Sequence, residues 1–257
     1  ETTSRLMLRV SLGVNKTATF YLGDVLYGFY TKPQIMVWAA DNGDGAYDTM
    51  FPYMQARGIP GSYAPTTDYL AAPNVNQITV AELQEMQAAG WTIIPHQTIG
   101  TALTSMSEAQ MRAEIEEVLA VHQSYGWTYK DFLYPSGGAG NDLSNTVMAS
   151  YGIKYGNNIN TGNLQKSQPL YGGTINPYRM WSYTADGKTF AQVETAVNHA
   201  IKYGGALGIL WHDGDGADEA PFKASMDYLY RLREANMIDL VNYETFFSRF
   251  THPRKAR

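Results

Sequence analysis

The pattern of apolar and polar positions alternates between short apolar runs and longer amphipathic stretches. The short runs predict buried strands, and the stretches with apolar residues at helical spacing predict amphipathic helices. Strands are predicted at 35–38, 91–94, 131–134, 153–155, 206–211 and 238–241. Helices are predicted at 47–57, 79–90, 107–125, 142–151, 189–203, 223–235 and 243–250. This alternation predicts an α/β fold with a parallel sheet, and 257 residues favour a barrel over an open sheet.

The first 33 residues follow a different pattern. Apolar residues between Leu6 and Leu12 alternate with other residues at the period of a half-buried strand, and further β-rich runs follow. We expect residues 1–33 to form a β-rich segment, either the end of a preceding β-sandwich or strands that pair with the main domain. The β/α barrel is expected to span residues 34–257. Because the chain opens with Glu1 and has no signal peptide, we expect it to be a fragment of a longer protein.

Polar residues gather where the predicted strands end. Asp41 and Asp44 follow the first barrel strand, and His96 and His212 each follow a later one. In parallel α/β enzymes the catalytic groups lie at these carboxyl ends. Carboxylates and imidazoles that meet at one edge suit a divalent metal. Each acidic turn or histidine also has a structural interpretation, in which the side chain bonds the local backbone or fills the core.

The composition narrows the class of ligand. Charged residues make up 17% of the chain, below the roughly 25% of average soluble domains, and aromatic residues make up 13%. A surface rich in Tyr, Asn, Thr and Gly favours sugars. The net charge of -5 argues against nucleic acid, and no apolar run approaches the roughly 20 residues of a membrane span. The absence of cysteine excludes disulfides, thiolate nucleophiles and Cys-ligated zinc.

Five short motifs follow one another in order over residues 35 to about 247. The first ends at Asp41, ahead of Phe51-Pro52 and Gly58-Ile59-Pro60. The later ones are His96-Gln97-Thr98-Ile99-Gly100, the run Tyr-Pro-Ser-Gly-Gly at 134–138, Pro177-Tyr178-Arg179 and Leu210-Trp211-His212. In this order they resemble the polysaccharide deacetylase family, and counting back from the two proline motifs aligns Asp41 with the second Asp of that family's opening motif. The resemblance implies a distorted β/α barrel and a carbohydrate esterase that removes acetyl groups.

In the mechanism that this resemblance implies, a metal polarises an acetyl carbonyl, an Asp takes a proton from water and a His protonates the leaving group. Asp41 and His96 are then the expected ligands of a divalent ion, with zinc expected. The expected catalytic residues are His212 and Arg179. The expected substrate contacts are Tyr134, Pro135, Gly137, Trp181 and Trp211. Because Trp38 and Trp211 lie inside predicted strands, a place in the core is their alternative.

Two positions depart from the family pattern. Ala40 stands where the family has its general base, and Gly100 stands where it has a second metal-binding His. We expect Asp44 to replace the base, since Gly43 and Gly45 would let its loop fold back towards Asp41. Asp213 and Asp215 are weaker candidates. With one ligand missing, the metal is expected to be weakly held or absent.

The sequence therefore leaves two hypotheses. The chain is either a metal-dependent deacetylase acting on N- or O-acetyl groups of a surface polysaccharide, or a catalytically impaired module that binds glycan. The second would serve a larger surface or virion protein. Either function is expected outside the cell, at its surface or on a virion, and oligomers are compatible with both.

Overall fold

The structure is a computed structural model. It describes residues 32–41, 43–71, 73–98, 100–127, 130–135, 141–160, 178, 180–203 and 206–248. Most of the expected N-terminal β segment lies outside these residues. So do two of the predicted site residues, Gly137 and Arg179.

Within the described residues, eight parallel strands form one curved sheet. They are β1 (Gln34–Ala40), β2 (Gly61–Ala64), β3 (Thr92–Ile93), β4 (Asp131–Leu133), β5 (Tyr155–Asn160), β6 (Met180–Thr184), β7 (Ala206–Leu210) and β8 (Asp239–Val241). Their order is β3-β2-β1-β7-β6-β5-β4, and β8 also pairs with β1. The backbone N–H of Leu133 donates to the carbonyl of Pro95 at 2.9 Å, so the two ends of the sheet meet. The predicted distorted β/α barrel is confirmed.

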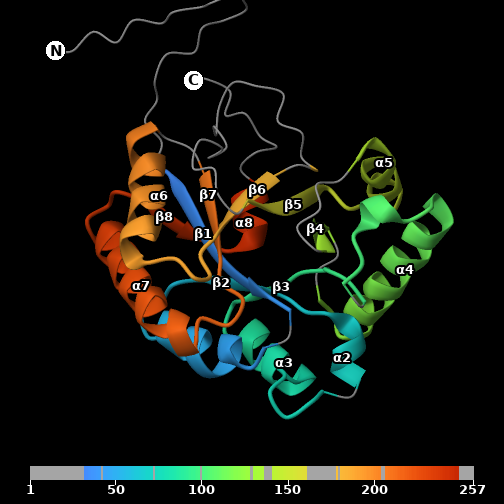
Figure 1. The fold of residues 1–257 in the computed structure, drawn as a ribbon, viewed down its shortest axis with the longest axis horizontal. Coiled ribbons are helices and arrows are strands. Elements are labelled where there is room, and N and C mark those ends of the chain that lie inside the picture. The colour runs from blue at the N-terminus through green and yellow to red at the C-terminus, as the bar shows by residue number, and fades with distance from the viewer. Residues whose placement is uncertain are drawn as a thin grey trace, which may run out of the picture.

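The helices follow the strands along the chain and cover the sheet. They are the π-helical turn η1 (Ala46–Met50), α1 (Phe51–Gln55), α2 (Thr67–Ala71), α3 (Val80–Ala88), α4 (Glu108–Ser124), α5 (Asp142–Ser150), α6 (Phe190–Tyr203), α7 (Glu219–Glu234) and α8 (Tyr243–Ser248), with short 3₁₀ turns at Leu103–Ser105 and Gly216–Asp218. In Figure 1, α6 and α7 lie at one side of the sheet and α4 and α5 at the other. Thr79 and Ser107 cap α3 and α4 with capping boxes, as predicted for Thr79. Among the described helices, none combines the length and apolarity that a membrane crossing requires.

Strand β1 is the centre of the core because both of its faces are buried. Ile35, Val37 and Ala39 pack in the cluster that includes the outer helices, whereas Met36, Trp38 and Ala40 face a second cluster. This follows from the alternation of side chains along a strand. Trp38 is buried and donates its indole N–H to Ser182. Trp211 has 0% of its surface exposed, so its predicted contact with a sugar is wrong and its alternative place in the core is correct.

Two strands differ from the sequence prediction. The strand predicted at 153–155 runs on to Asn160 as β5, and Trp181 lies on β6, a strand that was not predicted. In β5, Asn157 is buried and donates its side-chain amide to Ser182 Oγ. The polar side chains of these strands therefore bond each other within the sheet, which the apolar pattern does not reveal.

Candidate active site

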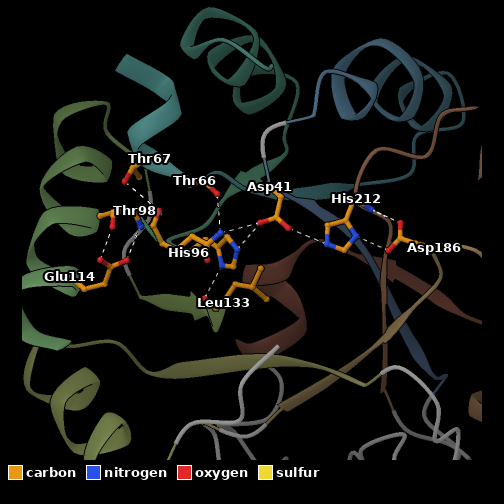
Figure 2. A network of polar contacts seen from close by, with 10 residues as sticks. Asp41, Thr66, Thr67, His96, Thr98, Glu114, Leu133, Asp186 and His212 are labelled. Atoms are coloured by element: carbon orange, nitrogen blue, oxygen red, sulfur yellow. Dashed lines mark hydrogen bonds and ion pairs between the residues drawn. The ribbon is translucent and has the colours of Figure 1, made fainter. Parts of the chain in front are cut away.

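Four chemically active side chains meet where the strands end, at the edge that we call the carboxyl edge. Asp41 follows β1, His96 follows β3, Asp186 follows β6 and His212 follows β7. Asp41 lies between the two histidines (Figure 2): Oδ1 is 3.0 Å from His96 Nε2, and Oδ2 is 3.1 Å from His212 Nε2. The structure thus joins three of the predicted site residues in one network.

The backbone of Asp41 leaves the strand in a left-handed conformation, with φ of 76°. Asp adopts this conformation more readily than most residues, and such strained positions concentrate at functional sites. Its N–H donates to the carbonyl of Ala64 at 3.2 Å, which fixes the turn against β2. The side chain keeps 45% of its surface exposed, so the carboxylate remains accessible to a ligand.

His96 is oriented from behind by the backbone. Its side chain is only 4% exposed, and Nδ1 lies 3.0 Å from the carbonyl oxygen of Leu133. Because a carbonyl oxygen only accepts, Nδ1 carries a proton and donates it. Nε2 is then directed at Asp41. Metal-binding histidines are held in this way, with the second ring nitrogen bonded to a carbonyl or a carboxylate.

His212 is held between two carboxylates. Its Nδ1 donates to Asp186 Oδ2 at 2.7 Å, and its backbone N–H donates to Asp186 Oδ1 at 2.8 Å. Hydrogen bonds to Asp186 and then to Asp41 raise the pKa of His212 to about 10, against an opposing effect of burial. His212 is therefore an imidazolium at neutral pH, and both of its ring nitrogens donate.

The two histidines in turn determine the charge of Asp41. Burial by itself would raise its pKa, but the hydrogen bond from the charged His212 and the close contact with His96 outweigh burial and lower the pKa below the ordinary 3.8. Gln97 adds a hydrogen bond from Nε2 to Asp41 Oδ1 at 3.2 Å and donates to Thr66 Oγ1 at 3.0 Å. The carboxylate is ionised throughout the physiological range.

Asp186 is the site residue that the sequence analysis missed. It follows β6, and that strand was not predicted, so no strand end marked its position. The signal in the sequence is Ala185-Asp186-Gly187, a polar turn of the same kind as those after β1 and β7. In the described residues, Asp186 provides the carboxylate contact that fixes His212.

The structure does not support Asp44 as the general base. Its backbone is fixed, because its N–H donates to Asn76 and its carbonyl accepts from Tyr47 and Asp48. None of the hydrogen bonds among the described residues joins its carboxylate to the network around Asp41. Gly43 and Gly45 serve close packing instead of flexibility, since a Cβ on Gly43 would lie 1.7 Å from Asp213 Oδ1.

Asp213, the weaker candidate, also has no hydrogen bond to Asp41, His96 or His212 among the described residues. Its Oδ1 is buried against Gly43 and has no hydrogen-bond partner among the described residues. Burial and then the charge of Asp215 raise the pKa of Asp213 to about 6. Ala40, at the family's base position, is buried in the core. No described carboxylate other than Asp41 and Asp186 bonds the two histidines.

The predicted substrate contacts differ in accessibility. Tyr134 and Pro135 are buried after β4, and the Tyr134 hydroxyl donates to Asn145 at 3.1 Å. Trp181 is partly exposed on β6 and stays a predicted contact. Gly137 and Arg179 lie outside the described residues, and so their predicted roles stay predictions.

Comparisons with known proteins show which family and which fold this chain resembles. A family model for polysaccharide deacetylases matches residues 31–156. No curated protein matches the chain. Many solved structures share the fold, and three of them illustrate the match.

The first is a Mycobacterium smegmatis protein described as a polysaccharide deacetylase, with a TM-score of 0.67, 11% identity and coverage of 91% of this chain and 96% of that one. The second is a family 4 carbohydrate esterase from Streptomyces lividans in complex with acetate, with a TM-score of 0.56, 16% identity and coverage of 80% and 91%. The third is a family 4 acetyl xylan esterase from Clostridium thermocellum in complex with a cobalt ion, with a TM-score of 0.56, 17% identity and coverage of 84% and 90%.

Proposed function

The chain belongs to the polysaccharide deacetylase family, and from that premise we propose that it hydrolyses acetyl groups of an acetylated polysaccharide. The family is one of carbohydrate esterases, which are hydrolases. The observation that carries the proposal is the place of Asp41 between His96 and His212 at the carboxyl edge. An ionised carboxylate beside an oriented imidazole and an imidazolium can bind a metal and also donate a proton.

The metal of this proposal is a divalent ion at Asp41 and His96. Among the described residues, no group of three His, Cys, Asp or Glu side chains could hold one. The two donor atoms nevertheless converge, and Oε1 of the neighbouring Gln97 is buried with no hydrogen-bond partner in the described part of the chain. A carboxylate, an imidazole and an unsatisfied amide fit a divalent cation. When bound, such an ion polarises an acetyl carbonyl and acidifies water.

His212 is the proton donor of the proposed reaction. Its Nε2–H lies at the carboxyl edge beside Asp41, where a leaving oxygen or nitrogen would take over the hydrogen bond. Asp186 keeps the ring charged and prevents it from rotating, because it binds both Nδ1–H and the backbone N–H. With a pKa of about 10, His212 holds its proton until the leaving group becomes basic.

A second candidate function follows from Ala40. The base position has no ionisable group, and among the described residues Asp44 has no hydrogen bond to the network, so proton abstraction from water lacks an assigned residue. Loss of a general base costs about a hundredfold to ten-thousandfold in rate. A slow deacetylase or a glycan-binding module would both fit this site. For either function, we propose that the glycan is a surface polysaccharide and that the protein acts outside the cell or on a virion.

Acetate release distinguishes the two functions. The wild type, His212→Ala and Asp41→Ala are compared on N-acetylated chitooligosaccharides and on O-acetylated xylan. Release by the wild type that both substitutions reduce by at least about a hundredfold would support the deacetylase. Binding of a glycan by the wild type without any release of acetate would instead support the glycan-binding module.

A further inference from the structure

Gln97 has an unsatisfied polar atom inside the site. The side chain is 7% exposed, and its Oε1 is buried with no hydrogen-bond partner among the described residues. Buried side-chain oxygens are nearly always bonded, so an exception at a functional site needs an explanation. The same amide donates through Nε2 to Asp41 Oδ1, which places the amide group beside the carboxylate.

The amide of Gln97 also occupies the space beside Gly100. A Cβ on Gly100 would meet Nε2 and Oε1 of Gln97 at 3.6 Å each. Gly100 has φ of 90°, a conformation in which an L side chain is strained. An imidazole at position 100 would therefore need a different backbone. The side chain of Gln97, three residues before Gly100, reaches the region where that imidazole would lie.

The three donor positions have the spacing of ligands around one ion. Asp41 Oδ1 is 3.0 Å from His96 Nε2 and 3.2 Å from the amide nitrogen of Gln97. Adjacent ligands of a six-coordinate ion with bonds of about 2.1 Å lie about 3.0 Å apart. A half-turn of the amide exchanges Oε1 with Nε2. Oε1 would then face Asp41 and could accept the hydroxyl proton of Thr66, which now accepts from Gln97.

We propose that Gln97 is the third protein ligand of a divalent ion, with Asp41 and His96, and replaces the imidazole that the family has at the position of Gly100. This inference rests on the metal of the proposed function. Two oxygens and one nitrogen make a harder ligand set than one oxygen and two imidazoles. Oxygen-rich sets suit Mn²⁺, whereas imidazoles suit Zn²⁺. The site is thus assigned to Mn²⁺, with waters completing its coordination.

The test is calorimetric titration of the metal-free protein with Mn²⁺. The variants are Gln97→Ala, Gln97→Glu and, as a matched control on the exposed face of α4, Gln123→Ala. Gln97→Ala should weaken Mn²⁺ binding by at least about tenfold. Gln97→Glu keeps an oxygen and adds a charge, so it should tighten binding. In the absence of the ion, the same charge beside Asp41 should lower the melting temperature. A merely structural role for Gln97 would not give these opposite signs.

Three results separate this inference from the proposed function. If Asp41→Ala and His96→Ala abolish Mn²⁺ binding and Gln97→Ala and Gln97→Glu both bind like the wild type, Gln97 is not a ligand, and the deacetylase proposal stands. If the wild type releases acetate and binds no Mn²⁺, the inference about Gln97 is overturned and the deacetylase proposal stands. If the wild type neither binds Mn²⁺ nor releases acetate, both proposals fail. Gln97→Glu keeps the test open should Gln97→Ala not fold.

Discussion

At the scale of single residues, the charge of His212 depends chiefly on Asp186. This carboxylate is the leading cause of the raised pKa of about 10. In Asp186→Asn the amide can accept a hydrogen bond but carries no charge, so the pKa of His212 should fall by at least about one unit. The high-pH limb of acetate release should move to lower pH with it.

The measurements for Asp186→Asn are an NMR titration of the His212 ring and a pH–rate profile. The exposed Asp68→Asn on α2 is the control and should change neither. The titration does not depend on activity. An unchanged pKa of His212 in Asp186→Asn would show that the contact seen in the structure does not govern the charge of the ring.

A second residue-scale prediction concerns Asp44. Because its carboxylate has no hydrogen bond to Asp41, His96 or His212 among the described residues, Asp44→Asn should leave acetate release within about threefold of the wild type. If Asp44 were the general base, its loss would lower the rate of acetate release by at least about a hundredfold. The measurement is the initial rate of acetate release at saturating substrate. A hundredfold loss, with melting temperature and metal affinity kept, would restore Asp44 as the base.

At the scale of elements, α4 fixes the segment that follows β3. The buried Glu114 on α4 accepts hydrogen bonds from the backbone N–H of Thr98 at 2.7 Å and from its hydroxyl at 2.6 Å. In Figure 2 this pair lies beside His96, so α4 supports the segment that presents both His96 and Gln97. The long amphipathic helix thereby contributes to the site without contacting Asp41.

Glu114→Gln should therefore weaken both the fold and the site. The amide keeps one acceptor oxygen where the carboxylate uses two, so one buried donor of Thr98 loses its partner. The free energy of unfolding should fall by about 1–3 kcal/mol, and affinity for Mn²⁺ should fall with it. Denaturant titration measures the first, with the exposed Glu117→Gln as the control. Stability equal to that of the control would contradict the role assigned to Glu114.

The elements also show how far the sequence predicts this molecule. β1, α3 and α4 were predicted because their apolar spacing and capping residues are local signals. β2 was missed because it consists of Gly61-Ser62-Tyr63-Ala64, four residues without an apolar run. Its glycine is required by the ring of Trp91, since a Cβ on Gly61 would lie 2.4 Å from the indole. That contact spans thirty residues, and no local pattern contains it.

The candidate site was also predicted where local signals mark its residues and missed where they do not. Asp41, His96 and His212 each end a strand, so the alternation of elements sufficed to find them. Asp186 was missed because β6 is bonded to its neighbours through polar side chains such as Ser182. The role of Asp44 as the base stays a prediction, but it was argued from the flexibility of its neighbouring glycines. They instead accommodate Asp213, which is distant in sequence and near only in the fold.

At the scale of the whole molecule, three of the described Asp and His side chains bind protons more tightly in the folded state than in the unfolded chain. Burial, and then the charge of Glu244, raise the pKa of Asp131 to about 7, against Lys130 and Lys154. The pKa of Asp213 is raised to about 6, and the pKa of His212 is raised to about 10. For each, folding takes up protons between its ordinary pKa and its raised one, so stability decreases as the pH rises through that interval.

These pH intervals together predict one trend in folding stability. The two carboxyls lower the stability as the pH rises from 3.8 to about 7, and His212 lowers it as the pH rises from 6.5 to about 10. Asp41 has a lowered pKa, so its contribution is present above 3.8 and is lost only in stronger acid. The metal-free protein should therefore be most stable near pH 4–5 and should become steadily less stable towards pH 10.

Asp131 provides the sharpest test of this trend, because it is 3% exposed and lies on β4, away from the carboxyl edge. Asp131→Asn removes the proton uptake of that group, so the decline in stability between pH 4 and 7 should become shallower. At pH 8 the buried carboxylate is ionised in the wild type and absent in the variant. The variant should then be the more stable by an amount on the order of 1–4 kcal/mol. Urea unfolding of the chelator-treated proteins at several pH values measures the effect, with the exposed Asp48→Asn as the control. A wild type that grows more stable from pH 5 to pH 8, or an Asp131→Asn variant with an unchanged slope, would show that this carboxyl is already ionised in the folded protein.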